Sequence, residues 1–232
     1  MRIGIISHSF TAAFRIYEEI RKLPGCELYI LLTPPKQRSP AFSILANFVR
    51  MFVASVTTPG WQLSRLPINR KVVFLPTSLD DPDSIAQLKD MKLDVGLLNA
   101  GIIYREPTIN AFRLGILNPH IGLLPAYRGR CVMEWSLLQG DPTGISVFFI
   151  DAGIDTGSRI VFSEKVWVQQ YESVAEAKQH LFDLDATFFR KALELIQQNE
   201  NDFKTNDGSG KRYYVMSQLF TRVVNDMLAE NN

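Results

Sequence analysis

The sequence predicts a doubly wound α/β fold, with a Rossmann-like and mostly parallel sheet. Three observations carry this prediction. Apolar runs of strand length alternate with amphipathic stretches of helical length, the runs are apolar throughout as in strands buried on both faces, and proline and glycine separate the segments. In such sheets ligands bind beyond the carboxyl ends of the strands, so the loops after strands are the candidate functional positions.

The N-terminal half alternates between strand and helix. Residues 3–6 are a short apolar run typical of a buried strand, and residues 10–23 form a helical stretch that Pro24 and Gly25 end. The same reasoning predicts strands at 28–32, 72–75 and 95–99, and a helix at 78–91.

The C-terminal half continues the alternation. This pattern predicts strands at 115–118 and 145–150, and an antiparallel edge strand at 160–168. The clearest helix spans residues 173–198, where Ser173 and Glu176 have the spacing of a capping box ahead of an apolar helical stripe.

Two regions depart from the alternation. Residues 36–70 are too long for an ordinary connection and contain an apolar helix candidate at 42–56, which favours core packing or a homodimer surface over membrane contact. Residues 200–212 are polar and are typical of a linker. The predicted organisation is therefore a catalytic domain at 1–200, with 36–70 as an insertion, followed by a linker and short appendage at 201–232.

Composition excludes several classes of function. The net charge of +1 gives no case for nucleic acid or an anionic membrane as partner. Three histidines and two cysteines outside any CxxC pair argue against a metal centre. The first apolar run is too short for a signal peptide, and no stretch has the roughly 20 apolar residues of a spanning helix, so a cytoplasmic location is expected.

Three polar residues follow predicted strands and could meet. Asn118 and His120 are two positions apart at the end of one strand, so an extended backbone points both side chains the same way. Asp155 lies in a glycine-bracketed loop after another strand. Taken singly, an Asn-x-His is most often a local hydrogen-bonding cap, and an Asp-Thr-Gly is most often a turn.

Together these groups suit attack by an amine on a formyl carbon. The amide of Asn118 can donate to the oxyanion, and His120 can donate to it or move a proton. Asp155 can orient the imidazole. The amine is itself the nucleophile, so the chemistry needs no serine or cysteine.

Four ordered motifs make the resemblance specific. They are Asn118-Pro-His120, Leu123-Leu-Pro-Ala-Tyr-Arg-Gly129, Gly140-Asp-Pro-Thr-Gly144 and Asp151-Ala-Gly-Ile-Asp155-Thr-Gly157. This series resembles the tetrahydrofolate-dependent formyltransferase family over about residues 74–165. The resemblance implies a formyltransferase fold, 10-formyltetrahydrofolate as co-substrate, a primary amine as acceptor, and Asn118, His120 and Asp155 as the catalytic trio.

The resemblance also implies where the folate binds. In the family the pterin ring lies against the backbone of two loops. These match Ala100, Gly101, Ile102, Ile103 and Tyr104 in the first loop, and Asp151, Ala152 and Gly153 in the second. Ile102 and Ile103 would be apolar walls of the site, although plain core residues would have the same character.

The acceptor amine is approached by elimination. The loop after the first strand lacks the glycines of glycinamide ribonucleotide enzymes, and too few residues follow Gly210 for the C-terminal barrel of methionyl-tRNA enzymes. A nucleotide-linked amino sugar is the leading expectation, with contacts from His8, Ser9, Tyr127 and Arg128. Enzymes of those two other kinds, and a non-catalytic relative that binds folate or nucleotide, stay as alternatives.

Two residues depart from the family's pattern. Gly122 stands where the family usually has serine before Leu-Leu-Pro, and Pro119 separates the two predicted catalytic side chains. Pro119 also removes one backbone donor. Both changes bear on the geometry of the site more than on the class of reaction.

Overall fold

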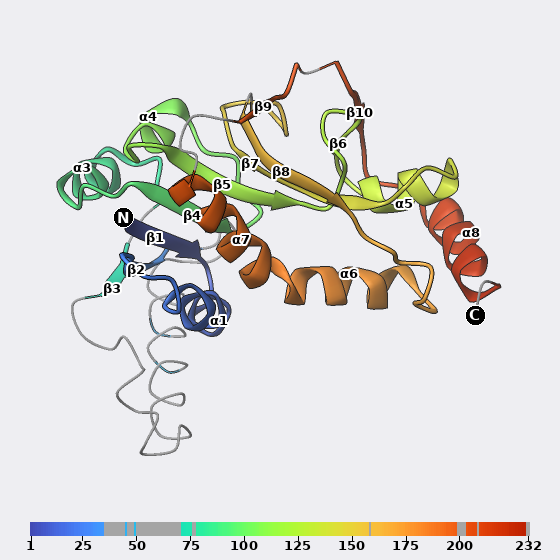
Figure 1. The fold of residues 1–232 in the computed structure, drawn as a ribbon, viewed down its shortest axis with the longest axis horizontal. Coiled ribbons are helices and arrows are strands. Elements are labelled where there is room, and N and C mark those ends of the chain that lie inside the picture. The colour runs from blue at the N-terminus through green and yellow to red at the C-terminus, as the bar shows by residue number, and fades with distance from the viewer. Residues whose placement is uncertain are drawn as a thin grey trace. The chain divides into compact units, whose positions relative to one another are not determined.

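The computed structural model describes residues 1–34, 45, 49, 71–75, 78–157, 159–198, 203–207 and 209–230 (Figure 1). The chain divides into two compact units, Met1–Leu117 and Asn118–Asn232. The insertion predicted at 36–70, and its helix at 42–56, lie outside the described residues except for residues 45 and 49.

The first unit contains a parallel sheet, which confirms the predicted fold class. Its strand order is β3-β2-β1-β4-β5, and every neighbouring pair is parallel. All five strands were predicted within two residues of their observed bounds, and the first four are continuous apolar runs. The strands are β1 (Arg2–Ser7), β2 (Glu27–Leu32), β3 (Val72–Phe74), β4 (Val95–Asn99) and β5 (Gly115–His120), whose last three residues begin the second unit.

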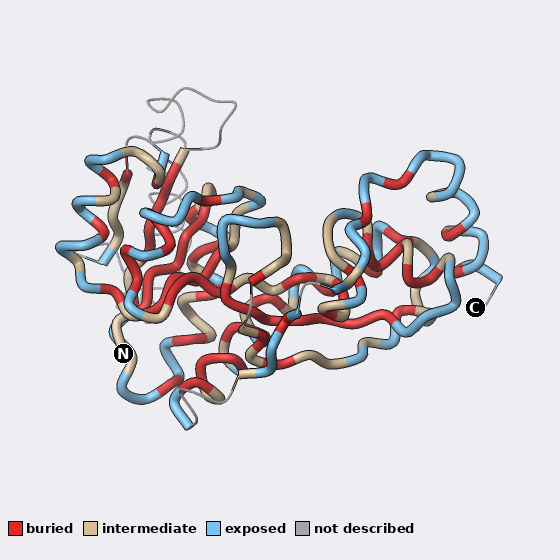
Figure 2. Tube along the Cα trace, turned by 90° about the horizontal axis from the view of Figure 1, so that it is seen from above, coloured by how far each residue is buried: buried red, intermediate tan, exposed pale blue. Residues whose placement is uncertain are grey.

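Helices cover both faces of this parallel sheet. They are α1 (Phe10–Ile20), α3 (Pro82–Asp90) and α4 (Glu106–Ile109). The chain moves outward from β1 to β2 through α1 and returns from β3 to β4 through α3, so right-handed crossovers place these two helices on opposite faces. Figure 1 shows α3 and α4 above the strands and α1 below them. The strands between them form the buried part of the unit (Figure 2).

The reversal of direction creates a topological switch point between β1 and β4. Ser7 ends β1 and Asn99 ends β4, and the Ser7 hydroxyl donates to the Asn99 carboxamide oxygen at 3.3 Å. Ligands of doubly wound sheets bind in the crevice outside the carboxyl ends of strands at such a point. The topology of the first unit therefore indicates residues 8–9 and 99–104 as candidate ligand-binding positions.

The second unit combines an antiparallel ribbon with a two-stranded parallel sheet. After the end of β5, the strands β7 (Gly144–Phe149), β8 (Arg159–Lys165) and β9 (Lys204–Thr205) follow in that order, with β8 antiparallel to both of its neighbours. The predicted antiparallel strand is confirmed, but β9 covers its outer side. The small sheet pairs β6 (Tyr127–Gly129) with β10 (Lys211–Tyr213).

The long predicted helix is two helices, α6 (Val174–Asp183) and α7 (Asp185–Gln198). Leu184 has φ −84° and ψ −7°, and its N–H donates hydrogen bonds to the carbonyls of both His180 and Leu181. This tightened last turn separates the helices. The predicted cap at Ser173 is confirmed, since its side chain accepts from the Glu176 N–H at 3.2 Å.

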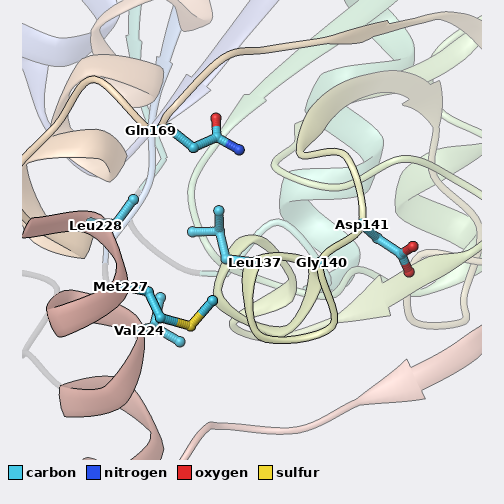
Figure 3. A pocket seen from close by; sticks show the side chains of 7 residues that line it. All are labelled: Leu137, Gly140, Asp141, Gln169, Val224, Met227 and Leu228. Carbon is cyan, nitrogen blue, oxygen red and sulfur yellow. The ribbon is translucent and has the colours of Figure 1, made fainter. Parts of the chain in front are cut away.

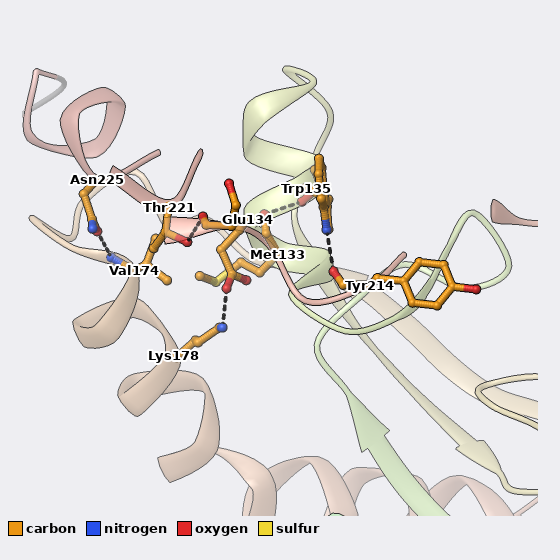
Figure 4. Close-up of polar contacts among 10 residues, drawn as sticks. Met133, Glu134, Trp135, Val174, Lys178, Tyr214, Thr221 and Asn225 are labelled. Carbon is orange, nitrogen blue, oxygen red and sulfur yellow. Dashed lines mark hydrogen bonds and ion pairs between the residues drawn. The ribbon is translucent and has the colours of Figure 1, made fainter. Parts of the chain in front are cut away.

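Two helices that the sequence reading did not identify complete this unit, α5 (Val132–Leu138) and α8 (Gln218–Ala229). Polar contacts connect them to α6 (Figure 4). Glu134 of α5 is 2 % exposed and forms an ion pair with Lys178 of α6. The Asn225 side chain of α8 accepts from the Val174 N–H at 2.9 Å. The residues after 213 are therefore packed into the unit rather than appended to it.

A pocket of about 170 Å³ lies between α5 and α8 (Figure 3). Its walls are mostly apolar, and its lining is Leu137, Gly140, Asp141, Gln169, Val224, Met227 and Leu228. Across the described part of the chain, no helix combines the length and the apolar character needed to span a bilayer.

Candidate active site

Asn118 and His120 lie at the end of β5, as the sequence predicted. His120 is buried, with 8 % of its surface exposed, whereas Asn118 is half-buried. The imidazole and the Phe148 ring pack edge to face, with the ring centres 6.4 Å apart and the planes at 84°. A buried imidazole packed against a neighbouring ring has a fixed orientation, which a proton-transfer group requires.

The two nitrogens of His120 have different partners. Nε2 lies 2.8 Å from the backbone carbonyl of Tyr127, and because a carbonyl only accepts, Nε2 carries the proton of that bond. Nδ1 faces the Asp155 carboxylate, with Oδ2 at 3.6 Å. That distance is longer than a hydrogen bond, and such contacts commonly tighten when a substrate binds. The structure thus brings His120 and Asp155 together.

The loop that carries Asp155 is fixed by its own side chains. The Asp151 carboxylate accepts from the Gly153 N–H at 2.9 Å and from the Thr156 hydroxyl at 2.8 Å. A Cβ on Gly153 would meet the Thr156 hydroxyl at 1.9 Å, and one on Gly157 would meet the Phe149 carbonyl at 1.8 Å. Asp155 itself has a left-handed backbone, with φ +50°. The Asp-x-Gly-x-Asp-Thr-Gly motif is therefore required for a tight turn that presents Asp155.

Strand β6 contacts both catalytic candidates through its backbone. The Tyr127 carbonyl accepts from His120, and the Gly129 N–H donates to Asp155 Oδ2 at 2.9 Å. The sequence reading expected substrate contacts from the side chains of Tyr127 and Arg128. In the structure the Tyr127 ring is 6 % exposed and stacks on Tyr213, with ring centres 5.1 Å apart, and the Arg128 Nε donates to the Gly210 carbonyl at 2.9 Å. Both side chains are thus engaged within the protein.

The buried hydroxyl of Tyr127 should affect how the unfolding free energy depends on pH in the alkaline range. Burial, followed by the hydrogen bond to Asp141, raises the pKa of this hydroxyl above its usual value near 10. The folded protein holds the Tyr127 hydroxyl in its neutral form. The contribution of this hydroxyl to the free energy of unfolding is therefore complete below about pH 10 and declines as the pH rises further. We expect the unfolding free energy of Tyr127→Phe to fall less than that of the wild type between about pH 8 and about pH 11.

Urea unfolding at several pH values measures this difference. Tyr214→Phe is the matched control, because Tyr214 is 64 % exposed, and it should follow the wild-type pH dependence. An identical decline in the wild type and Tyr127→Phe would contradict the prediction.

The first folate-loop candidates belong to the first unit. The Ile102 N–H donates to the Ala100 carbonyl at 2.8 Å, which turns the chain directly after β4. Gly101 is exposed and Ile103 is 51 % exposed, whereas Tyr104 is buried at 1 %. Ile103 therefore presents an apolar side chain at the surface of this loop, and the Tyr104 side chain is packed in the protein interior.

Asp80 fixes the far end of this loop and was not identified from the sequence. Its Oδ1 accepts from the Arg105 N–H at 2.9 Å and from the Thr108 hydroxyl at 2.6 Å. The loop is consequently held at both ends, with its exposed backbone between them.

His8 and Ser9, the acceptor candidates of the first unit, follow β1 at the switch point. Both are half-buried, and His8 Nδ1 lies 2.9 Å from the Thr33 carbonyl at the end of β2. Ser9 is the N-cap of α1, and its side chain makes no capping hydrogen bond. These positions follow β1 at the switch point, where doubly wound sheets bind ligands.

Among the described residues, no group of three or more histidine, cysteine, aspartate or glutamate side chains is arranged to hold a metal ion. Ala152 and Gly153 are exposed, in the same turn as Asp151.

The sequence profile of the formyl transferase family matches residues 38–193. Among curated proteins, a methionyl-tRNA formyltransferase of Alkaliphilus oremlandii (strain OhILAs) is 29 % identical over 185 residues. That alignment covers 74 % of this chain and 59 % of the relative, so the chain spans well under two thirds of the relative's length.

Solved structures share the fold. Glycinamide ribonucleotide transformylase 1 from Symbiobacterium toebii superposes with a TM-score of 0.62 at 20 % identity, covering 89 % of this chain and 93 % of the other. A formyltransferase from Anoxybacillus kamchatkensis, solved with UDP-4,6-dideoxy-4-formamido-L-AltNAc and tetrahydrofolate, gives a TM-score of 0.55 at 16 % identity and covers all of both chains (100 %). At these identities the likeness concerns the fold alone.

Proposed function

The chain belongs to the formyl transferase family, and from this premise we propose that it transfers a formyl group from 10-formyltetrahydrofolate to a primary amine. The observation that carries the proposal is the contact between His120 Nδ1 and the Asp155 carboxylate at 3.6 Å, in the same unit as Asn118 at the end of β5. An amide, an imidazole and a carboxylate are the groups that formyl transfer requires.

The reaction forms one bond and breaks another at the formyl carbon. The amine nitrogen attacks that carbon, the bond from the carbon to N10 of the folate breaks, and the proton lost by the amine ends on N10. Asn118 donates an N–H to the oxygen on which negative charge develops. His120, oriented through Nε2 by the Tyr127 carbonyl, exchanges its proton at Nδ1, and Asp155 stabilises the charged imidazole.

Folate binding is assigned to the two loops named from the family's pattern. The turn at 100–104 exposes backbone at Gly101 and an apolar side chain at Ile103, which suits the flat face of a pterin. In the second loop, the Asp151 carboxylate holds its own turn, so the backbone of Ala152 and Gly153 stays exposed. Backbone groups of this kind recognise a heterocycle by hydrogen bonding without a specific side chain.

A nucleotide-linked amino sugar is the acceptor that we propose. The half-buried His8 and Ser9 lie at the N-terminus of α1, where backbone N–H groups favour an anion such as a nucleotide phosphate. Methionyl-tRNA is the second candidate, and it is favoured by the sequence similarity to methionyl-tRNA formyltransferases. The near-neutral net charge of +1 favours the smaller acceptor.

A panel of acceptors tests this proposal. The purified chain is incubated with 10-formyltetrahydrofolate and, separately, with UDP- and dTDP-linked amino sugars, glycinamide ribonucleotide and methionyl-tRNA. Tetrahydrofolate release and mass spectrometry of the acceptor are the measurements. We expect formylation of an amino sugar and no formate release when the amine is omitted.

The other outcomes discriminate between the alternatives. Formylation of methionyl-tRNA alone would support the second candidate. Formate release without an amine would indicate a hydrolase. Binding of folinic acid, measured by calorimetry, with no transfer to any amine would contradict the proposal and indicate a non-catalytic relative.

A further inference from the structure

The chain from residue 203 to the end of β10 contacts the loop that carries Asp155 and the strand β6, whose backbone contacts both His120 and Asp155. We name residues 203–207 and 209–213 the C-terminal segment. Its polar composition predicted a linker, but within the second unit β9 pairs with β8 and β10 pairs with β6. Figure 1 shows β10 running beside β6.

Asn206 connects the C-terminal segment to the loop of Asp155. Its side chain is buried at 5 %, and its Nδ2 donates to the Asp155 carbonyl at 3.3 Å and to the Gly157 carbonyl at 3.1 Å. The left-handed backbone of Asp155 is a conformation that non-glycine residues adopt only when their surroundings fix it. Asn206 supplies two of the hydrogen bonds that fix it.

Strand β10 connects the same segment to β6. The pairing is parallel, with Lys211 opposite Tyr127 and Tyr213 opposite Gly129, and the Arg130 N–H donates to the Tyr213 carbonyl at 3.1 Å. A Cβ on Gly129 would lie 2.2 Å from the Tyr213 carbonyl oxygen. Glycine at 129 thus permits an approach that no other residue allows, and Gly129 is the residue whose N–H contacts Asp155.

The Tyr213 ring fixes the other end of β6. It lies almost parallel to the Tyr127 ring, with an angle of 12° between the planes, and its hydroxyl is 3.2 Å from the Gln139 side chain. Gln139 also contacts the Tyr127 hydroxyl, at 3.1 Å. The residue whose carbonyl orients His120 is consequently held by stacking and by a shared hydrogen-bond partner.

We propose that Asn206 and Tyr213 are positioning residues for formyl transfer. They act through the backbone of the Asp155 loop and of β6, the strand that contacts both His120 and Asp155. This inference rests on the proposed function. Asn206 fixes the backbone from which the Asp155 carboxylate projects, and Tyr213 fixes the strand that donates to that carboxylate and accepts from the imidazole. The contacts that carry the proposal are those of Asn206 Nδ2 with the Asp155 and Gly157 carbonyls and of Tyr213 with the Tyr127 ring.

Steady-state kinetics of four variants test the proposal. Asn206→Asp keeps the size of the side chain but removes the donor, and Tyr213→Ala removes the stacked ring. We expect each to lower kcat about tenfold while the KM for 10-formyltetrahydrofolate stays within about twofold of the wild type, because positioning errors below 1 Å affect the transition state most. Tyr213→Phe keeps the ring and should restore kcat. Tyr214→Ala is the matched control on the exposed neighbouring ring and should behave as the wild type.

NMR of the histidine ring nitrogens gives a readout that does not depend on turnover. The chain has three histidines, so the His120 signal is assigned by its loss in His120→Gln. We expect the Nε2–H signal of His120 to shift or broaden in Tyr213→Ala and to stay in place in Tyr213→Phe, with the His8 and His180 signals unchanged. If Tyr213→Ala does not fold, Tyr213→Leu, which keeps apolar volume, replaces it.

The outcomes separate the two proposals. A wild type that transfers no formyl group refutes the proposed function, while a displaced His120 signal in the variants still supports the positioning contact. Variants with wild-type kcat and an unchanged His120 signal overturn the inference. Loss of stability with wild-type kcat per folded molecule would also overturn it, because it would show a purely structural role.

Discussion

Replacing His120 with alanine, or Asp155 with asparagine, is expected to lower the rate of formyl transfer by about 10²–10⁴-fold. Each change removes one partner of the contact at 3.6 Å between the imidazole and the carboxylate. His120→Ala removes the group that moves the proton, and Asp155→Asn removes the charge that stabilises the protonated ring while keeping an oxygen for the Gly129 N–H. Single-turnover assays with a saturating acceptor measure the chemical step directly.

His180→Ala is the matched control for His120→Ala. His180 is an exposed residue of α6 whose ring lies near Tyr171, with ring centres 5.2 Å apart. We expect this variant to transfer the formyl group at the wild-type rate. Circular dichroism checks that all three variants are folded. Turnover near the wild-type rate in folded His120→Ala or Asp155→Asn would remove those residues from the assigned roles.

Introducing serine at Gly122 is expected to lower turnover by about 10²-fold, although serine is the usual residue of the related motif. A Cβ at this position would lie 2.7 Å from His120 Nε2, 2.8 Å from Val132 Cγ2 and 2.9 Å from the Tyr127 carbonyl oxygen. It would therefore enter the hydrogen bond that orients the imidazole, and one of the atoms it meets is backbone that cannot rotate away. The displaced imidazole would no longer present Nδ1 to Asp155.

Ala126→Ser is the matched control for this change, because it adds a hydroxyl to an exposed position of the same loop. Its turnover should equal that of the wild type. The histidine ring signals should show a displaced His120 in Gly122→Ser and an undisturbed His120 in Ala126→Ser. A Gly122→Ser protein that is fully active would mean that the His120–Tyr127 contact is dispensable for transfer.

The parallel sheet could be predicted because its strands are buried on both faces. Runs such as those of β1 and β4 are continuously apolar, and a continuous apolar run of strand length, bounded by turn residues, has few other structures open to it. The short elements could not be predicted in this way. Strand β6 has three residues, and its Tyr127 and Arg128 have the character of ligand-binding side chains when the partner strand is unknown.

Helices α5 and α8 of the second unit were not identified, for two different reasons. Helix α5 has seven residues and begins after Cys131, whose left-handed φ of +55° is not a recognisable start signal. Helix α8 does carry signals, because Ser217 caps it and apolar residues recur at helical spacing from Leu219 to Leu228. The cap and the spacing of these apolar residues are therefore sufficient to predict α8.

The proposed catalytic trio was predicted from the order of the motifs, but the residues that contact its loops were not. Asn206 and Tyr213 lie in a stretch whose polarity resembled that of a linker. That polarity has a different cause, since the carbonyls around Asp155 need a donor from elsewhere in the chain and a side-chain amide supplies it. Local sequence cannot reveal such a need, because the donor and the carbonyls are 51 and 49 positions apart.

The contact between Arg128 and Gly210 joins residues that are 82 positions apart, and it sets an order of events during translation. A ribosome that adds roughly 5–20 residues per second needs about 4–16 s to synthesise that length. The nascent polypeptide therefore contains its imidazole and carboxylate for several seconds before β10 exists to pair with β6. A newly made molecule completes the proposed site late, when β10 has been synthesised and the loop between β6 and β10 has closed.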